Sequence, residues 1–228
     1  MTPEEEKETD DVSGPAIAPD EPGGPAAADA PEEPGEQADP DALADPPAEV
    51  AELAAACVRF ATARYGVMPD FTAETLSLVD QWLRDARRDI EQRPEMVGLV
   101  QAAAGAYLGE VVRRAFGARW ITGEDHAGWR LCMSTVYCAF NPIGMAREAL
   151  MLDTAEGWHA HFELDPGEKE LIEARLAALP EVTDEDYYAP STRFDVVNIV
   201  VDALREHMRA SGLGDVRFAP ADYQHQGA

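Results

Sequence analysis

The stretch that decides the fold is Gly-Ala-Tyr-Leu-Gly-Glu-Val-Val-Arg-Arg-Ala-Phe-Gly-Ala-Arg-Trp, residues 105–120. Its spacing predicts a helix over about 95–116 that stops at Gly117, yet Gly105 and Gly109 lie inside that helix. Each interior glycine costs a helix about 1 kcal/mol relative to alanine. Their presence therefore indicates that something approaches the helix very closely.

Three glycines share this close approach. At about 100° per residue, Gly98, Gly105 and Gly109 fall on one narrow arc of the predicted helix. A neighbouring backbone packed against the arc explains all three, and a ligand lying along it is the alternative. We therefore interpret Gly98, Gly105, Gly109 and Trp120 as packing residues, so that this stretch predicts architecture rather than chemistry.

The first fifth of the chain differs in composition from the rest. The whole chain has 228 residues and a formal net charge of −26. Residues 1–50 hold 16 acidic residues, one lysine and 10 of the 17 prolines, without an aromatic residue. Such a segment buries too little apolar surface to offset its ordering entropy. We predict a disordered acidic tail over 1–46, either solubilising or able to dock on a basic partner.

Composition also limits the class of protein. We find neither a signal-peptide pattern at Met1 nor an apolar run long enough to span a membrane, and the three cysteines are too few for a disulfide framework. We therefore expect a cytoplasmic protein. Residues 51–228 still carry 28 acids against 17 bases, which disfavours nucleic acid as the main partner.

The order of the predicted elements indicates a single α+β domain over 47–212, mostly helical with a small antiparallel sheet. Helices are predicted over 48–65, from Thr72 to before Pro94, and over 95–116, 143–152, 168–179 and 194–210. Strands are predicted at 119–121, within 129–140 and at 158–164, with a hairpin turn at 123–128. Residues 213–228 are predicted to be a loosely ordered extension.

One predicted strand carries a possible metal site. Residues 158–164 alternate, which places His159, His161 and Glu163 on one face with neighbours about 7 Å apart. Two histidines so spaced ligate zinc when a further ligand arrives from elsewhere. The alternative is the solvated face of an edge strand. No catalytic residue is predicted, and zinc is the one cofactor that the sequence leaves open.

Two further groups of side chains have competing interpretations. Tyr187, Tyr188 and Arg193 form an aromatic–basic cluster of the kind enriched at protein interfaces. The alternative is that one tyrosine covers the core while Arg193 pairs with Asp195 or another nearby acid. Glu110 is predicted to pair with Arg114 four residues on. The three cysteines are interpreted as core residues, since the sequence places no base beside Cys132 or Cys138.

Several short motifs support a resemblance. They are Asp70-Phe71-Thr72-Ala73-Glu74-Thr75-Leu76, Tyr107-Leu108-Gly109-Glu110-Val111 with Arg113-Arg114, Gly117 and Trp120, and Phe140-Asn141-Pro142. The chain from about Phe71 to Leu204 resembles a family of small uncharacterised bacterial domains on these residues. The resemblance implies no established activity, although some such domains look like accessory or immunity-type binding proteins.

The functional expectation follows from these points. We expect a non-catalytic accessory protein, of the immunity type, that binds a protein partner, and the acidic charge favours a basic one. A metal-dependent hydrolase using His159, His161 and Glu163 is the first alternative, and a structural subunit of a larger assembly is the second. The oligomeric state is left open.

Overall fold

The structure is a computed structural model that describes residues 43–224. It is an α+β fold, mostly helical, with one four-stranded antiparallel sheet in the order β1-β2-β3-β4. The predicted fold class is therefore confirmed. Most of the predicted tail, residues 1–42, and the last four residues of the predicted C-terminal extension, 225–228, lie outside the described residues.

Helices dominate the chain order. They are α1 (Ala48–Tyr65), α2 (Leu76–Gln92), α3 (Val97–Phe116), α4 (Pro142–Met151), α5 (Lys169–Ala177), α6 (Asp184–Tyr188) and α7 (Pro190–Ala210). The strands are β1 (Ala118–Ile121), β2 (Arg130–Met133), β3 (Cys138–Phe140) and β4 (Glu163–Leu164). Short 3-10 turns lie at η1 (Ala73–Thr75), η2 (Pro94–Met96), η3 (His126–Gly128) and η4 (Pro220–Tyr223).

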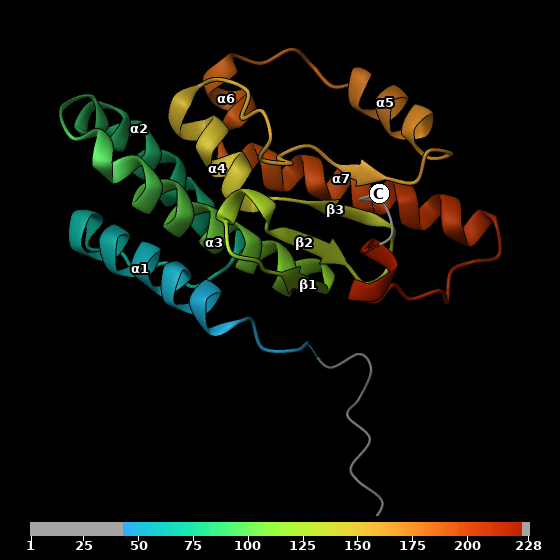
Figure 1. Ribbon diagram of the computed structural model, residues 1–228. Helices are drawn as coiled ribbons and strands as arrows, with labels where there is room; N and C mark the ends of the chain where they lie inside the picture. Colours follow the sequence, from blue (N-terminus) through green and yellow to red (C-terminus); the bar gives the residue numbers. More distant parts are fainter. Residues whose placement is uncertain (1–42, 225–228) are drawn as a thin grey trace, which may run out of the picture. The chain divides into compact units, whose positions relative to one another are not determined.

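Helix α3 lies at the centre of the helical part (Figure 1). It contacts α1, α2, α4 and α7 as well as β1 and β2, and every residue from Val100 to Arg113 is buried. One hydrophobic core extends from Val50 in α1 to Met208 in α7. The small residues of α3 are therefore surrounded on several sides, as the glycine-rich sequence requires.

The glycines of α3 differ in what they touch. A Cβ atom on Gly105 would collide with the Cα atom of Ile143 and would lie 2.7 Å from both the Ile143 nitrogen and the Pro142 oxygen. A Cβ atom on Gly109 would meet the indole ring of Trp120, with Cη2 at 2.5 Å. Gly98 is exposed and has nothing within 4 Å of that position. Its assignment as a packing residue is wrong, because α4 crosses α3 farther along.

The buried acid of α3 pairs differently from the prediction. Arg113 donates from Nε and Nη2 to the two carboxylate oxygens of Glu110, each at 2.8 Å, and from Nη1 to the Ala44 carbonyl at 2.6 Å. Trp120 Nε1 donates to Glu110 at 2.9 Å. The predicted partner Arg114 is 3.8 Å away and largely exposed. The Trp120 indole orients the carboxylate, and the Ala44 carbonyl before α1 holds the Arg113 guanidinium beside it.

The sheet begins with the predicted hairpin. Strands β1 and β2 pair antiparallel, with Ala118 opposite Met133 and Ile121 opposite Arg130. The predicted region 129–140 divides into β2 and β3, which pair through Leu131 and Phe140. Asn141 then caps α4, because its side-chain oxygen accepts from the backbone nitrogens of Ile143 at 2.9 Å and Gly144 at 3.3 Å.

The predicted strand over 158–164 is wrong except at its end, since β4 contains Glu163 and Leu164 alone. His159 has a positive φ of 51°, and its carbonyl accepts from the Asn141 nitrogen at 2.8 Å. A Cβ atom on Gly144 would lie 2.7 Å from the Trp158 carbonyl. This segment therefore packs on the first turn of α4 before it reaches the sheet.

The last described residues are attached to the sheet. Tyr223 donates its hydroxyl to the carbonyls of Met133 at 2.8 Å and Val136 at 3.0 Å, and its ring stacks on Tyr137. The Phe218 nitrogen donates to the Ser134 carbonyl at 2.9 Å. The loose extension predicted over 213–228 stays a prediction, and within it Phe218 and Tyr223 attach the chain beside the β2–β3 turn.

Helix α7 begins four residues before its predicted start. Pro190 occupies its first turn, and Asp80 of α2 accepts from the Ser191 nitrogen at 3.1 Å and from the Ser191 hydroxyl. Burial raises the pKa of this Asp80 carboxyl above its usual range, although both Ser191 bonds oppose that shift. An acid far away in sequence thus caps α7 in place of a local residue.

Candidate functional site

Glu148 of α4 is the centre of the candidate site. Its side chain is fully buried, and Arg193 of α7 donates from Nη2 to Oε2 at 2.7 Å. The Ala155 nitrogen donates to Oε1 at 3.2 Å. Arg193 is 4% exposed, so both charges of the pair are removed from water. Two buried charges are tolerated when each neutralises the other, and either alone is strongly destabilising.

Two tyrosines cover this ion pair. The Arg193 guanidinium lies 4.4 Å from the ring centroid of Tyr187 and 5.3 Å from that of Tyr188, and the two rings meet edge to face. Tyr187 is 44% exposed. The predicted cluster of Tyr187, Tyr188 and Arg193 thus exists as a contact group, but the partner of Arg193 is Glu148 rather than Asp195. Stacking on a cation fixes the exposed ring in one orientation.

The predicted metal residues lie around a neighbouring cleft of about 750 Å³. His159, His161 and Glu163 all line it, together with Arg130. Glu163 accepts from Arg130 at 2.9 Å, and His161 Nε2 lies 3.8 Å from Glu148 Oε1. Two of the three side chains thus face other charged groups.

The described residues do not form a metal centre. Across residues 43–224, no group of three or more His, Cys, Asp or Glu side chains is arranged to hold a metal ion. The expected alternation of one strand fails at His159, where the backbone turns through a positive φ. The ligand set predicted from the sequence is therefore not assembled in this fold.

The comparisons with known proteins bear on a different part of the chain. Residues 28–132 match the model of a family of unknown function, DUF6278. No curated protein and no solved structure gives a match. The resemblance to an uncharacterised domain family agrees with this finding. The DUF6278 match includes α1, α2, α3, β1 and most of β2, and it ends before Glu148 and Arg193.

Two of the three cysteines lie in the matched region, and burial raises the pKa of all three thiols. Cys57, Cys132 and Cys138 are free and buried. Burial raises the pKa of Cys132 to about 12 and raises the pKa of the other two thiols. A thiol in that state is protonated at neutral pH and is a poor nucleophile.

No helix among residues 43–224 is long and apolar enough to cross a membrane.

Sequence reasoning missed Glu148 and Asp80. Glu148 stands in a helix whose other residues from Pro142 to Leu150 are apolar apart from Arg147, and an acid in such a run is a signal of a buried partner. Asp80 lies four residues before Arg84 on α2, a spacing typical of an exposed ion pair, and so gives no such signal. Its role depends on the position of α7, which sequence does not supply.

Proposed function

We propose that this chain is a non-catalytic binding protein that recruits a basic protein partner through the surface around Tyr187. The net charge supports the proposal, since the chain contains 44 acidic residues and 18 basic ones. Acidic surfaces accelerate encounters with basic partners and disfavour acidic ones.

The Tyr187 surface consists of residues 179–188. Three of its large hydrophobic side chains are exposed, Leu179 by 39%, Val182 by 52% and Tyr187 by 44%. Exposed acids alternate with them, namely Glu181, Asp184 and Asp186. Apolar anchors within a charged rim are the usual composition of a protein interface, and the acids favour a partner rich in lysine or arginine.

The fixed ring of Tyr187 is the observation that carries this proposal. An exposed aromatic held on the buried Arg193–Glu148 pair loses little conformational entropy on binding, which favours affinity. Glu110 and Glu148, the two most deeply buried acids of the described residues, each bind an arginine, so neither carboxylate is free to act as a catalytic acid or base. This supports binding over catalysis.

The experiment is affinity capture by the full chain from cells of its native host, with quantification at graded salt. We expect a basic protein whose retention falls as salt rises. Tyr187→Ala should weaken binding by about 30-fold or more if Tyr187 is an anchor residue. Phe60→Ala is the matched control, since Phe60 is an aromatic of similar exposure, 41%, on α1.

Three outcomes would contradict the proposal. Equal retention by both variants would place the contact elsewhere, and a homo-oligomer by light scattering without captured partner would favour a structural subunit. Stoichiometric zinc by elemental analysis, lost when His159 and His161 become alanine, would favour the hydrolase.

A further inference from the structure

The cleft beside the sheet, with a volume of about 750 Å³, contains an ion pair that is only partly hydrogen-bonded. Arg130 of β2 donates from Nη1 to Oε2 of Glu163 in β4 at 2.9 Å, and both side chains line the cleft. Among residues 43–224, Nε and Nη2 of Arg130 bond no acceptor, and Oε1 of Glu163 bonds no donor. The Nε atom is buried, and a buried donor without an acceptor costs stability. The pair therefore keeps donors and an acceptor for a ligand in the cleft.

The sheet register explains why these two side chains meet. Ala139 of β3 lies opposite Glu163 of β4 on one side and opposite Cys132 of β2 on the other. Residues that lie opposite each other, and residues two apart on one strand, point to the same face of a sheet. Arg130 precedes Cys132 by two residues and so shares this face. The ion pair therefore forms above Ala139, a small residue that also lines the cleft.

Apolar side chains line the cleft beside the ion pair. Phe162, which directly precedes Glu163, is half-buried and meets the buried ring of Phe140 edge to face, with ring centroids 5.5 Å apart. The small residues Ala155 and Ala160 line the cleft as well and leave room for a ligand. Aromatic rings pack favourably against one another in edge-to-face or offset arrangements. This part of the cleft therefore suits a flat apolar ring.

The remaining titratable groups of the cleft lining are Glu156, His159 and His161. Glu156 is exposed and has no ion-pair partner within residues 43–224. His161 Nε2 lies 3.8 Å from a carboxylate oxygen of Glu148, whose charge Arg193 neutralises. None of these groups takes up the free donors and acceptor of the ion pair.

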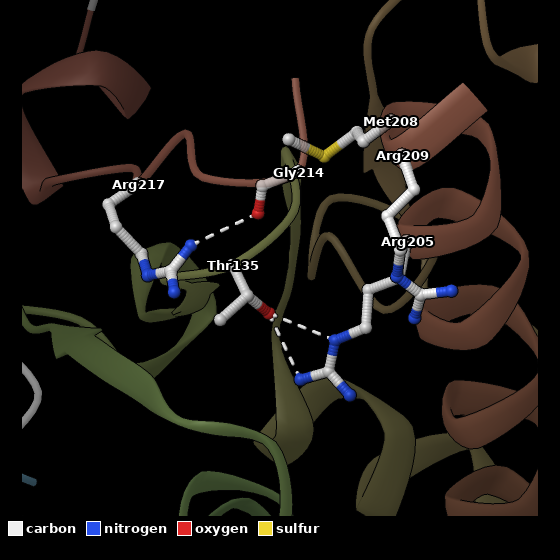
Figure 2. Close-up of a pocket in the computed structure, with 6 residues that line it drawn as sticks. All are labelled: Thr135, Arg205, Met208, Arg209, Gly214 and Arg217. Atoms are coloured by element: carbon white, nitrogen blue, oxygen red, sulfur yellow. Dashed lines mark hydrogen bonds between the residues drawn. The ribbon is translucent and has the colours of Figure 1, made fainter. Parts of the chain in front are cut away.

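A smaller pocket of about 320 Å³ beside α7 differs from the cleft in how its polar groups are used. Figure 2 shows that its arginines bind the protein itself, since Arg205 donates to the Thr135 hydroxyl and Arg217 donates to the Gly214 carbonyl. These bonds hold α7 on the β2–β3 turn and stabilise the segment that follows the helix. The described lining of this pocket contains no carboxylate beside an arginine, so the larger cleft is the better candidate for a ligand.

We propose that the cleft binds a flat aromatic ring that carries an uncharged amide. The amide oxygen accepts from the Arg130 guanidinium and the amide nitrogen donates to the free oxygen of Glu163, so the ion pair stays intact. A carboxylate in the same place would face Glu163, and an amidinium would face Arg130. Either charged ligand therefore has to break the ion pair, whereas the amide completes its hydrogen bonds. The volume of about 750 Å³ lies in the range usual for small-molecule sites.

The test is a nuclear magnetic resonance titration of the isotope-labelled full chain with benzamide, benzoate and benzamidine, which share one ring and differ in charge. We expect benzamide to shift the Nε–H signal of Arg130 and the backbone amide signals of residues 159–163 in a saturable way. Benzoate and benzamidine should bind about tenfold more weakly or less, because each deprives one member of the ion pair of a charge-assisted hydrogen bond.

A substitution in the ion pair should reverse this preference. Glu163→Gln leaves Arg130 without a counter-charge, so this variant should bind benzoate about tenfold more tightly than benzamide. Arg130→Gln should favour benzamidine for the same reason, and it keeps the test decisive if Glu163→Gln does not fold. Glu156→Gln is the matched control, because it removes an equal charge from the same cleft outside the ion pair. The control should bind benzamide as tightly as the native chain does.

Three results would overturn the proposal. The first is the absence of saturable shifts with benzamide. The second is binding of benzoate or benzamidine to the native chain as tight as that of benzamide, which would contradict an uncharged ligand. The third is an effect of Glu156→Gln as large as that of Glu163→Gln, which would reduce recognition to net charge. Tyr187 is not part of the cleft lining, so failure here is separable from failure of the partner-binding proposal.

Discussion

The contact between α3 and α4 can be tested with two glycines of the same helix. In Gly105→Ala the new Cβ atom would lie 2.7 Å from the Ile143 nitrogen and the Pro142 oxygen, whereas Gly98→Ala meets nothing within 4 Å. Ordinary contacts between heavy atoms are about 3.5 Å or longer, so α4 would have to move by at least roughly 0.8 Å, and the Cα atom of Ile143 lies closer still. The obstacle is backbone, and the Asn141 cap holds it in place.

The expected changes in the free energy of unfolding have opposite signs for the two variants. Alanine gains about 1 kcal/mol of helix propensity over glycine in both, and slightly less at Gly98 near the start of α3. Overpacking costs about 1–3 kcal/mol, and a rigid obstacle favours the upper value. We therefore expect Gly105→Ala to lower the free energy of unfolding by about 2 kcal/mol and Gly98→Ala to raise it by about 0.5–1 kcal/mol.

The assay is urea unfolding followed by far-ultraviolet circular dichroism, together with thermal unfolding. A loss of about 2 kcal/mol lowers the Tm by roughly 4–8 °C in a domain of this size. The dependence of the free energy on urea should stay unchanged in both variants, since the surface exposed on unfolding does not change. If Gly105→Ala is as stable as Gly98→Ala, the close approach of α4 is refuted.

Two further predictions concern buried charges and thiols. Glu148→Leu should cost about 3–5 kcal/mol because Arg193 is left buried and unpaired, and adding Arg193→Met should recover part of that loss in a double-mutant cycle. An undamaged single variant would contradict the pairing. Burial raises the pKa of Cys132 to about 12 and also raises the pKa of the two other thiols. All three thiols therefore keep their protons in the native state, whereas thiols of the unfolded chain lose theirs near pH 8.5. Stability should therefore be fully present below about pH 8.5 and fall as pH rises, by about 1.4 kcal/mol per pH unit for each thiol. Urea unfolding at several pH values measures this fall in stability, and Cys57→Ala should lose less stability between neutral and high pH. Rapid reaction of the native thiols with Ellman's reagent would contradict the prediction.

The features that were predicted correctly depend on neighbours in sequence. Helix α1 spans the predicted residues because apolar side chains recur at helical spacing and Gly66 ends it in a left-handed conformation, with φ of 71°. The β1–β2 hairpin follows from the turn residues between two short β-rich runs. In both cases local conformational preference and burial favour the same structure.

The incorrect predictions concern segments whose structure depends on an element far away in the sequence. The segment 158–164 does alternate in burial, with Ala160 and Leu164 buried and His159 and His161 exposed, as the pattern indicated. Its backbone nevertheless bonds to Asn141, the N-cap of α4, and the close approach is possible because Gly144 has no Cβ atom. Alternation reports which side chains face the core, but it does not report which backbone supplies the hydrogen bonds.

The distribution of arginines bears on the binding proposal. Arg113 and Arg193 each neutralise a buried carboxylate, and Arg84 and Arg87 bind Glu185 within the Tyr187 surface. A basic peptide should therefore compete with the protein partner at the Tyr187 surface.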